Sequence, residues 1–282
     1  MPVPVNLSAS DITATSVRLN WVAGTFNPLQ ALIASLFGNG EQGAFYIPMP
    51  VVLGRQALFQ DSAGTVPVTA DGDPVGRTLD QSGNGNHVTQ SVSGSRPVYR
   101  TDGTLHWLET NGVNQFLSGN AFVWAISLTT GVSVSVGMEA LPQSDNRLIG
   151  EGSSSSISPI YSPVQSDRVS TVQLVSFGRD DDQIVFIDYV DTSAGNAFNG
   201  SAHVSTHKNF SSVVTNLVDG VQVASFSYSN STLTLDTFAI GALVRTSPIS
   251  FYEGKIFGSV ISEASNTTEQ DSYLAPLSGV TL

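Results

Sequence analysis

Residues 209–229 read NFSSVVTNLVDGVQVASFSYS and place Asp219-Gly220 between two apolar runs. Asp-Gly flanked in this way is the strongest short-range signal for a β-hairpin, because both residues adopt the backbone angles that a two-residue turn requires. The segment therefore predicts two antiparallel strands joined by a tight turn.

Further short strands with turn residues between them are predicted on both sides of this hairpin. Their regular spacing favours an all-β sandwich. The predicted strands are HWLETNG (106–112), GVSVSVGMEAL (131–141), VSTVQLVSFG (169–178), DQIVFIDYVD (182–191), LDTFAIGALV (235–244) and YEGKIFGSVISE (252–263).

The composition supports the same fold class and limits the partners. Charged residues make up 12% of the 282 residues, and the formal net charge is −12. With 11 Lys and Arg spread along the chain, no basic stripe exists for nucleic acid or an anionic membrane. No apolar run approaches the roughly 20 residues that span a bilayer, so no membrane insertion is predicted. The chain has no cysteine, which excludes disulfides and thiolate chemistry.

The N-terminal part predicts a small appendage to the main body. Residues 1–25 contain a two-stranded ribbon that resembles the opening strands of a fibronectin type III domain, and residues 26–43 form an amphipathic helix and linker. Pro28 suits the first turn of a helix over residues 28–37, and Gly38 can end it. The apolar residues of both segments are candidates for docking to a partner: Val17, Leu19, Trp21, Leu29, Leu32, Ile33 and Leu36.

The rest of the chain, residues 44–282, is predicted to form the sandwich domain. It ends in NTTEQDSYLA, whose Asn-Thr-Thr before Glu and Gln is typical of the start of a short helix.

The loop DQSGNGNHVTQ (80–90) has three interpretations: a metal loop, a sugar-binding loop or a tight turn. Calcium prefers six to eight oxygen ligands, several of them carboxylates. Asp80 is the only carboxylate in this loop, so a calcium site would also need Asp71 or Asp73. We therefore predict no cofactor, with bound calcium as the alternative. Sugar contact would fall to Asn84, Asn86 and His87.

Four segments in order resemble the concanavalin A-like (laminin G-like) jelly-roll domains of bacteriophage virion proteins over roughly residues 40–280. They are GEQGAFYIP (40–48), DQSGNGNH (80–87), RPVYRTDGTLHWLETNGVNQFLS (96–118), and NLVDGVQV (216–223) followed by FAIGALV (238–244) and SFYEGKIFGSVISE (250–263).

Two departures from this family's motifs affect the expected site. The acidic pair of the family's strand is replaced in Thr110–Gln115, which weakens the calcium interpretation. Phe45 and Ile47 stand where the family carries Trp and Asp, so this normally polar loop is expected to pack against another part of the molecule.

The resemblance implies a virion surface component: a head fibre, spike, decoration protein or tail appendage, assembled in the host cytoplasm. Its implied partners are capsid or tail proteins, copies of itself and host-surface glycans. Two alternatives stay open: a carbohydrate-active hydrolase of the same fold, and a structural cement protein without a ligand.

Catalysis finds little support in the sequence. The nearest carboxylate pair to a glucanase motif is Asp188 and Asp191, whose odd spacing on a strand sends them to opposite faces. His203 and His207 share a strand face about 13 Å apart, too far to bind one metal, and are predicted to lie at the surface. Tyr161, in the Ser- and Pro-rich segment 152–166, is predicted to be an exposed, ligand-binding aromatic in a loop.

Overall fold

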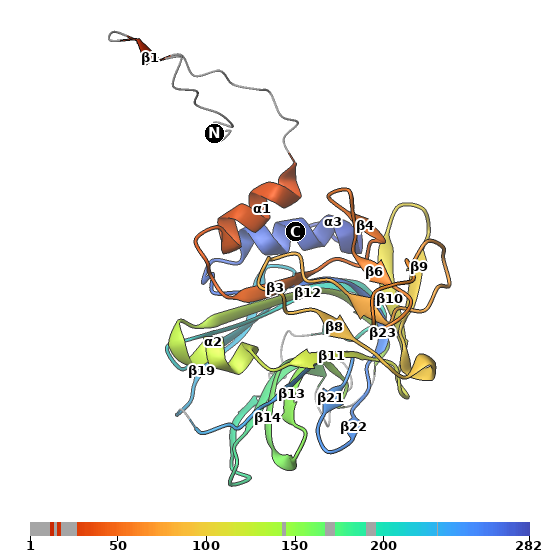
Figure 1. Cartoon of the computed structure of the whole chain (residues 1–282). Helices are drawn as coiled ribbons and strands as arrows, with labels where there is room; N and C mark the ends of the chain where they lie inside the picture. Colours follow the sequence, from red (N-terminus) through yellow and green to blue (C-terminus); the bar gives the residue numbers. More distant parts are fainter. Residues whose placement is uncertain are drawn as a thin grey trace.

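The computed structural model describes residues 12–13, 16–17, 27–142, 145–166, 173–189, 196–229 and 231–282. Two large antiparallel sheets pack face to face, and two helices cover the outside of one of them (Figure 1). The predicted all-β sandwich is therefore confirmed.

The eight-stranded sheet has the order β19-β18-β17-β12-β23-β10-β9, and β3 pairs with β23 next to β10. Its strands are β3 (Gly43–Tyr46), β9 (Val98–Thr101), β10 (His106–Asn111), β12 (Val132–Ala140), β17 (Ala202–Phe210), β18 (Val213–Val218), β19 (Val221–Ser227) and β23 (Glu253–Ser262).

The nine-stranded sheet has the order β16-β15-β14-β13-β20-β11-β8-β7-β6. Its strands are β6 (Leu58–Phe59), β7 (Arg77–Thr78), β8 (Val88–Thr89), β11 (Leu117–Asn120), β13 (Arg147–Ser153), β14 (Ser156–Ser166), β15 (Leu174–Arg179), β16 (Val185–Tyr189) and β20 (Thr237–Ile240).

Smaller elements complete the described chain. None of its helices is long and apolar enough to cross a membrane. The remaining elements are the hairpins β1 (Ile12–Thr13) with β2 (Ser16–Val17), β4 (Val51–Val52) with β5 (Arg55–Gln56) and β21 (Leu243–Val244) with β22 (Pro248–Ile249), the helices α1 (Pro28–Phe37), α2 (Val123–Thr129) and α3 (Thr268–Ser278), and the short turn η2 (Ser93–Ser95).

The hairpin predicted around Asp219-Gly220 is β18–β19. Asp219 has φ of 50° and Gly220 has φ of 75°, the left-handed angles that a two-residue hairpin turn needs. The local turn chemistry therefore fixes the pairing of these two strands.

The main core lies between the two sheets and follows the alternation of the strands. In β12, Val134, Val136 and Met138 point into this core and are fully buried. Ser133 and Ser135 point to the outer face of the sheet and are fully buried as well. A sheet in water would leave such an outer face exposed, so another layer must cover it.

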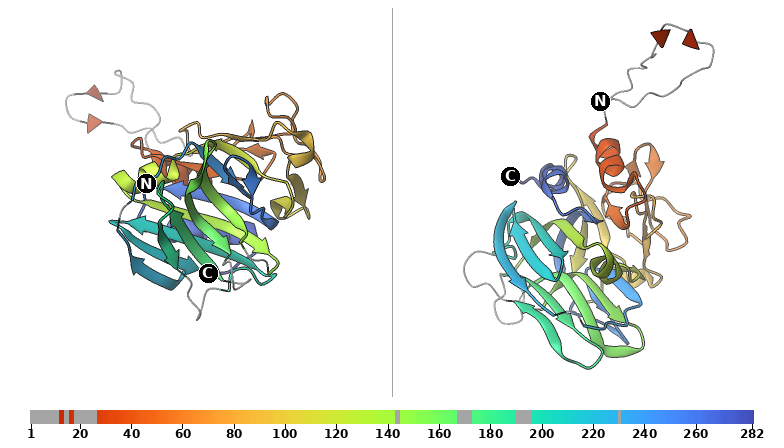
Figure 2. Two further views of the ribbon diagram at one scale, coloured as in Figure 1. Left: turned by 90° about the horizontal axis from the view of Figure 1, so that it is seen from below. Right: turned by 90° about the vertical axis from the view of Figure 1, so that its left-hand side faces the viewer.

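That layer is a second core under helices α1 and α3, on the outer face of the eight-stranded sheet (Figure 2). Asn27 caps α1 by accepting hydrogen bonds from the N–H groups of Leu29 and Gln30. In α3, buried Asp271 accepts hydrogen bonds from the hydroxyls of Ser135 (2.6 Å) and Thr206 (2.7 Å) on the sheet below. The helices therefore belong to the sandwich domain, and α3 confirms the predicted C-terminal helix.

The predicted docking role of α1 is wrong for its apolar face. Leu29, Leu32 and Leu36 are buried in the second core, and Ile33 packs against it half-buried. Their apolar surface is used within this chain, so it is not available to a partner. Leu19, Trp21 and the side chain of Val17 lie outside the described residues.

Phe45 and Ile47 pack as expected, since both are fully buried in the second core. The segment 152–166 was predicted to be a loop, and this is wrong: most of it is the strand β14, hydrogen-bonded to β13 on one side and β15 on the other. Helix α2 was not predicted.

Candidate functional site

The loop of residues 80–87 is a clasp that ties the nine-stranded sheet to β3. The carboxylate of Asp80 is buried and accepts four hydrogen bonds. Its Oδ1 accepts from the N–H groups of Phe45 (2.9 Å) and Ser82 (2.8 Å). Its Oδ2 accepts from the Ser82 hydroxyl (2.8 Å) and the Asn86 N–H (3.0 Å). Both oxygens are thus committed to the fold, which favours the tight-turn interpretation.

The two asparagines of this loop also serve the clasp. Asn84 Nδ2 donates to the carbonyls of Glu41 and Gly43, each at 3.1 Å, and Asn86 Nδ2 donates to the Gly43 carbonyl at 2.8 Å. Their predicted sugar contact would compete with these bonds. Of the three predicted ligand residues in the loop, His87 lines a cavity of about 500 Å³.

The other calcium candidates hold turns of their own. Asp71 accepts from the Thr101 N–H at 3.0 Å and lies 3.5 Å from the Arg100 guanidinium. Asp73 Oδ2 accepts from the N–H groups of Thr69 and Ala70. Within the described parts of the chain, no group of three or more acidic or histidine side chains is placed to hold a metal ion.

Tyr161 was predicted to be exposed, and this is wrong because its side chain is fully buried between the sheets. Its hydroxyl lies 2.7 Å from Nε2 of His207, whose Nδ1 lies 2.7 Å from the Ser176 hydroxyl. His207 is fully buried too, so its predicted surface position is also wrong, whereas His203 is partly exposed beside Asp219. The Ser176–His207 pair is sealed from solvent, so it cannot meet a substrate.

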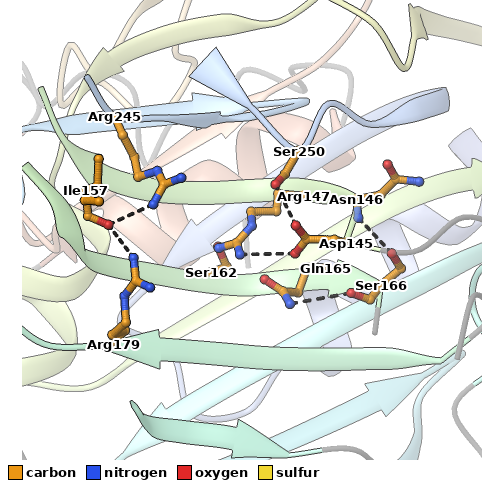
Figure 3. Close-up of polar contacts among 10 residues, drawn as sticks. All are labelled: Asp145, Asn146, Arg147, Ile157, Ser162, Gln165, Ser166, Arg179, Arg245 and Ser250. Atoms are coloured by element: carbon orange, nitrogen blue, oxygen red, sulfur yellow. Dashed lines mark hydrogen bonds and ion pairs between the residues drawn. The ribbon is translucent and has the colours of Figure 1, made fainter. Parts of the chain in front are cut away.

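Three arginines gather on the outer face of the nine-stranded sheet (Figure 3). Arg147 is buried, donates to the Ser162 hydroxyl at 2.8 Å and lies 3.2 Å from the Asp145 carboxylate. Arg179 and Arg245 both donate to the backbone carbonyl of Ile157. These contacts bind the strand β14 to its surroundings, and they explain how a segment rich in Ser and Pro is held as a strand.

The side chains of Asp188 and Asp191, the carboxylate pair considered for a hydrolase, lie outside the described residues. Asp188 is on β16 opposite Phe177, and the backbone of Asp191 lies outside them as well.

A groove of about 530 Å³ crosses the outer face of the eight-stranded sheet at the ends of β9, β10, β23 and β12. We call it the outer-face groove. The last turn of α3 lies on the same face of the sheet, where Ser278 is against Gly137, two residues before Glu139. It is lined by Val98, Glu109, Thr110, Asn111, Gln115, Glu139, Leu141, Gly200, Glu253, Gly254 and Lys255.

A row of charged side chains crosses this groove. Glu109 and Glu139 pair in register with Lys255 from its two sides, so all three point to the same face of the sheet. Lys255 Nζ lies 2.8 Å from the Glu139 carboxylate, and Glu109 lies 2.8 Å from Nε of Arg100. With Glu253, the lining carries three carboxylates and one ammonium group, which makes it acidic.

An aromatic ring adjoins the row. Half-buried Trp107 packs against Phe257, and Lys255 Nζ lies 5.2 Å from the centre of its ring. This places an indole beside an open groove that is lined by an ammonium group and several carboxylates and amides.

Sequence reasoning missed the outer-face groove. Glu109, Glu139 and Lys255 come from three strands that are far apart in the chain, and only the strand register brings them together. The only sequence signal was their position at alternate residues of predicted strands, opposite the apolar residues that face the core.

Comparison with known proteins gives structural neighbours only. No protein-family model matches the sequence, and no curated protein sequence is similar to it. Domain 4 of AbnA, a GH43 extracellular arabinanase from Geobacillus stearothermophilus in complex with arabinotriose, has a TM-score of 0.49 and 15% identity, over 70% of this chain and 91% of that chain.

Two further solved structures show a similar level of likeness. The Ruminococcus gnavus IT-sialidase CBM40 bound to α2,3-sialyllactose has a TM-score of 0.42 and 11% identity, over 56% of this chain and 86% of that chain. The NanB sialidase of Streptococcus pneumoniae, as its K499G mutant, has a TM-score of 0.43 and 14% identity, over 62% of this chain. This chain spans 27% of the length of that sialidase.

Proposed function

We propose that this chain is a non-catalytic glycan-binding module on the surface of a phage or phage-like particle. The observation that carries the glycan-binding part is the outer-face groove, which is open and about 530 Å³ in volume. That volume falls in the range of small-molecule sites, and an open groove admits a segment of a polymer.

The chemistry of the lining suits sugar hydroxyl groups, which both donate and accept hydrogen bonds. The carboxylates of Glu109 and Glu139 accept, Lys255 donates, and the Gln115 amide can do both. The Trp107 ring adds an apolar, flat surface next to the polar row.

The same row supports binding without turnover. A glycosidase needs one carboxyl group that carries a proton and a second that acts as nucleophile or base, about 5 to 9.5 Å apart. Glu109 and Glu139 are both in ion pairs with basic side chains. Because β23 lies between their strands, their backbones are about 10 Å apart, and Lys255 of β23 lies between the two glutamates.

The particle assignment rests on the motif resemblance of residues 40–280 to phage jelly-roll proteins. We propose a head fibre, spike, decoration protein or tail appendage that assembles in the host cytoplasm and contacts capsid or tail proteins and copies of itself. Residues 1–25 remain our candidate for docking, since the apolar face of α1 is occupied within the chain.

A glycan array probed with the full chain tests the glycan-binding part. Gln115→Ala and Glu109→Gln change groove side chains that are not in the core, and we expect each to weaken retention about tenfold. Glu263→Gln is the matched control, because Glu263 directly follows β23 at the opposite end of that strand from Glu253 and lies outside the groove. Unchanged retention by both groove variants would refute this site, and release of reducing ends would refute the non-catalytic assignment.

Mass spectrometry of purified particles from the producing host tests the particle part. Particles should contain Gln115→Ala and Glu109→Gln in the same amount as the unchanged chain. Strong particle binding together with a blank glycan array would select the cement-protein alternative, and absence from particles would refute the virion assignment.

A further inference from the structure

A second groove, of about 500 Å³, lies between helix α1, the β4–β5 hairpin and the clasp loop. We call it the hairpin groove. Three apolar residues, Val52, Leu53 and Leu79, contribute to its lining. The other lining residues are Gly83 and the polar residues Gln30, Arg55, Gln56, Asp80, Gln81 and His87.

The clasp fixes which nitrogen of His87 carries a proton. The backbone N–H of Asp80 donates to Nδ1 of His87 at 3.0 Å, so Nδ1 must be an acceptor. A neutral imidazole has one donor and one acceptor nitrogen. Nε2 of His87 is therefore a hydrogen-bond donor that the clasp does not use.

Arg55 adds a positive charge to the same groove. It is exposed on β5, and within the described residues no carboxylate forms an ion pair with it. The hairpin holds it in place through a tight turn in which Leu53 has φ of 50° and Gly54 has φ of 76°. A guanidinium group favours a planar anion that can accept two parallel hydrogen bonds.

Most hydrogen-bond acceptors in the lining of this groove are uncharged. Asp80 is the one carboxylate in its lining, and both of its oxygens are engaged by the four donors of the clasp. Gln56 and Gln81 use their Nε2 groups to donate to backbone carbonyls, Gln56 to that of Leu58 and Gln81 to that of Leu79. Because both Nε2 groups donate in this way, the Oε1 atom of each side chain is the one that can accept from a hydroxyl group.

We propose that the hairpin groove is a second binding site, for a sugar acid whose carboxylate is bound by Arg55 and Nε2 of His87. The amide oxygens of Gln56 and Gln81 then accept from the hydroxyl groups of the sugar, and the apolar lining residues pack against its ring. The lining of the outer-face groove has three carboxylates and one ammonium group, so it suits such a ligand less well than the hairpin groove does. This site does not depend on the function proposed for the outer-face groove.

Isothermal titration of the full chain with D-glucuronate, D-glucose and glycerol phosphate tests the proposal. We expect D-glucuronate to bind about tenfold more tightly than D-glucose. Arg55→Gln should weaken D-glucuronate binding about tenfold, because it removes the charge from an exposed side chain without disturbing the core. Lys255→Gln, a charge change in the outer-face groove, is the control and should leave D-glucuronate binding unchanged.

The following results of the titrations would contradict the proposed sugar-acid site. Equal affinity for D-glucose would show that no carboxylate is recognised, and tighter binding of glycerol phosphate would replace the sugar acid by a phosphate. Two results would place the ligand outside the hairpin groove. One is an Arg55→Gln variant that binds D-glucuronate as tightly as the unchanged protein does. The other is a Lys255→Gln variant that no longer binds D-glucuronate.

Discussion

The hydroxyl of Tyr161 and Nε2 of His207 lie 2.7 Å apart between the two sheets, and both side chains are fully buried. Burial disfavours the charged imidazolium and lowers the pKa of His207 from 6.5 to about 3. The folded state therefore keeps this histidine neutral, while the unfolded chain protonates it below pH 6.5.

His207 should make the protein sensitive to acid. Because its folded pKa lies below its unfolded pKa, its contribution to stability is complete above pH 6.5 and is lost as the pH falls toward 3. As the pH falls, the free energy of unfolding should decrease in both proteins. The decrease should be steeper in the unchanged protein than in His207→Gln, by about 1.4 kcal/mol per pH unit. Urea unfolding at several pH values between 6.5 and 4.5 measures this, and parallel curves for the two proteins would contradict it.

Glu151 should have the opposite pH dependence. Its buried carboxylate accepts from the N–H groups of Phe122 (2.6 Å), Val123 (2.7 Å) and Trp124 (2.8 Å) at the start of α2. Burial outweighs these three bonds and raises its pKa from 4.5 to about 7. A raised folded pKa means that its contribution is complete below pH 4.5 and is lost as the pH rises through 7.

Comparison with Glu151→Gln isolates this effect, since the amide does not titrate. The difference in unfolding free energy between the unchanged protein and the variant should shrink by about 3 kcal/mol from pH 4.5 to pH 7. His207 is present in both proteins, so its own pH dependence cancels. A difference that grows over this range would show that the N–H donors outweigh burial.

The sequence predicted the parts of the fold that local chemistry controls. Asp219-Gly220 determined its hairpin, and Pro28 marked the start of α1, which Asn27 caps in the structure. In contrast, β14 looks like a loop because its Ser and Pro residues have weak strand preference. Its partners β13 and β15 and the arginines on its outer face hold it as a strand.

The candidate sites were harder to predict, because they depend on which distant surfaces meet. The apolar face of α1 was recognised, but only the structure identifies α3 and β3 as the surfaces that cover it. His207 lies among polar residues in the sequence, and only the packing of the two sheets buries it. Asp80 was named as a candidate calcium ligand, and in the structure its carboxylate accepts the four hydrogen bonds of the clasp.

The clasp around Asp80 should be essential to stability. Asp80→Asn replaces one carboxylate oxygen by an N–H₂ group, which would face the donors of Ser82 or Asn86. We expect a loss of about 2 to 4 kcal/mol in the free energy of unfolding. Asp102→Asn is the matched control: only Oδ1 of Asp102 accepts bonds, from Thr104 and Leu105, so the asparagine can keep both. Equal losses in the two variants would contradict the role of the clasp.

Calcium should have no effect on this loop, because the four donors already fill the oxygens of Asp80. The melting temperature of the full chain should be the same in millimolar calcium chloride and in excess EDTA. A rise of several degrees with calcium, lost in Asp80→Asn, would restore the metal-loop interpretation.

The buried face of α1 should contribute to folding rather than to association. Leu32 is 6% exposed in the second core, and Leu32→Ala should reduce the free energy of unfolding by about 2 kcal/mol or more, since it leaves a cavity. Ala34→Gln, on the exposed side of the same helix, should change stability by less than about 0.5 kcal/mol. Urea unfolding and light scattering of both variants separate the two roles. A Leu32→Ala protein that keeps its stability but loses self-association would show that this face is a docking surface, as the sequence alone had suggested.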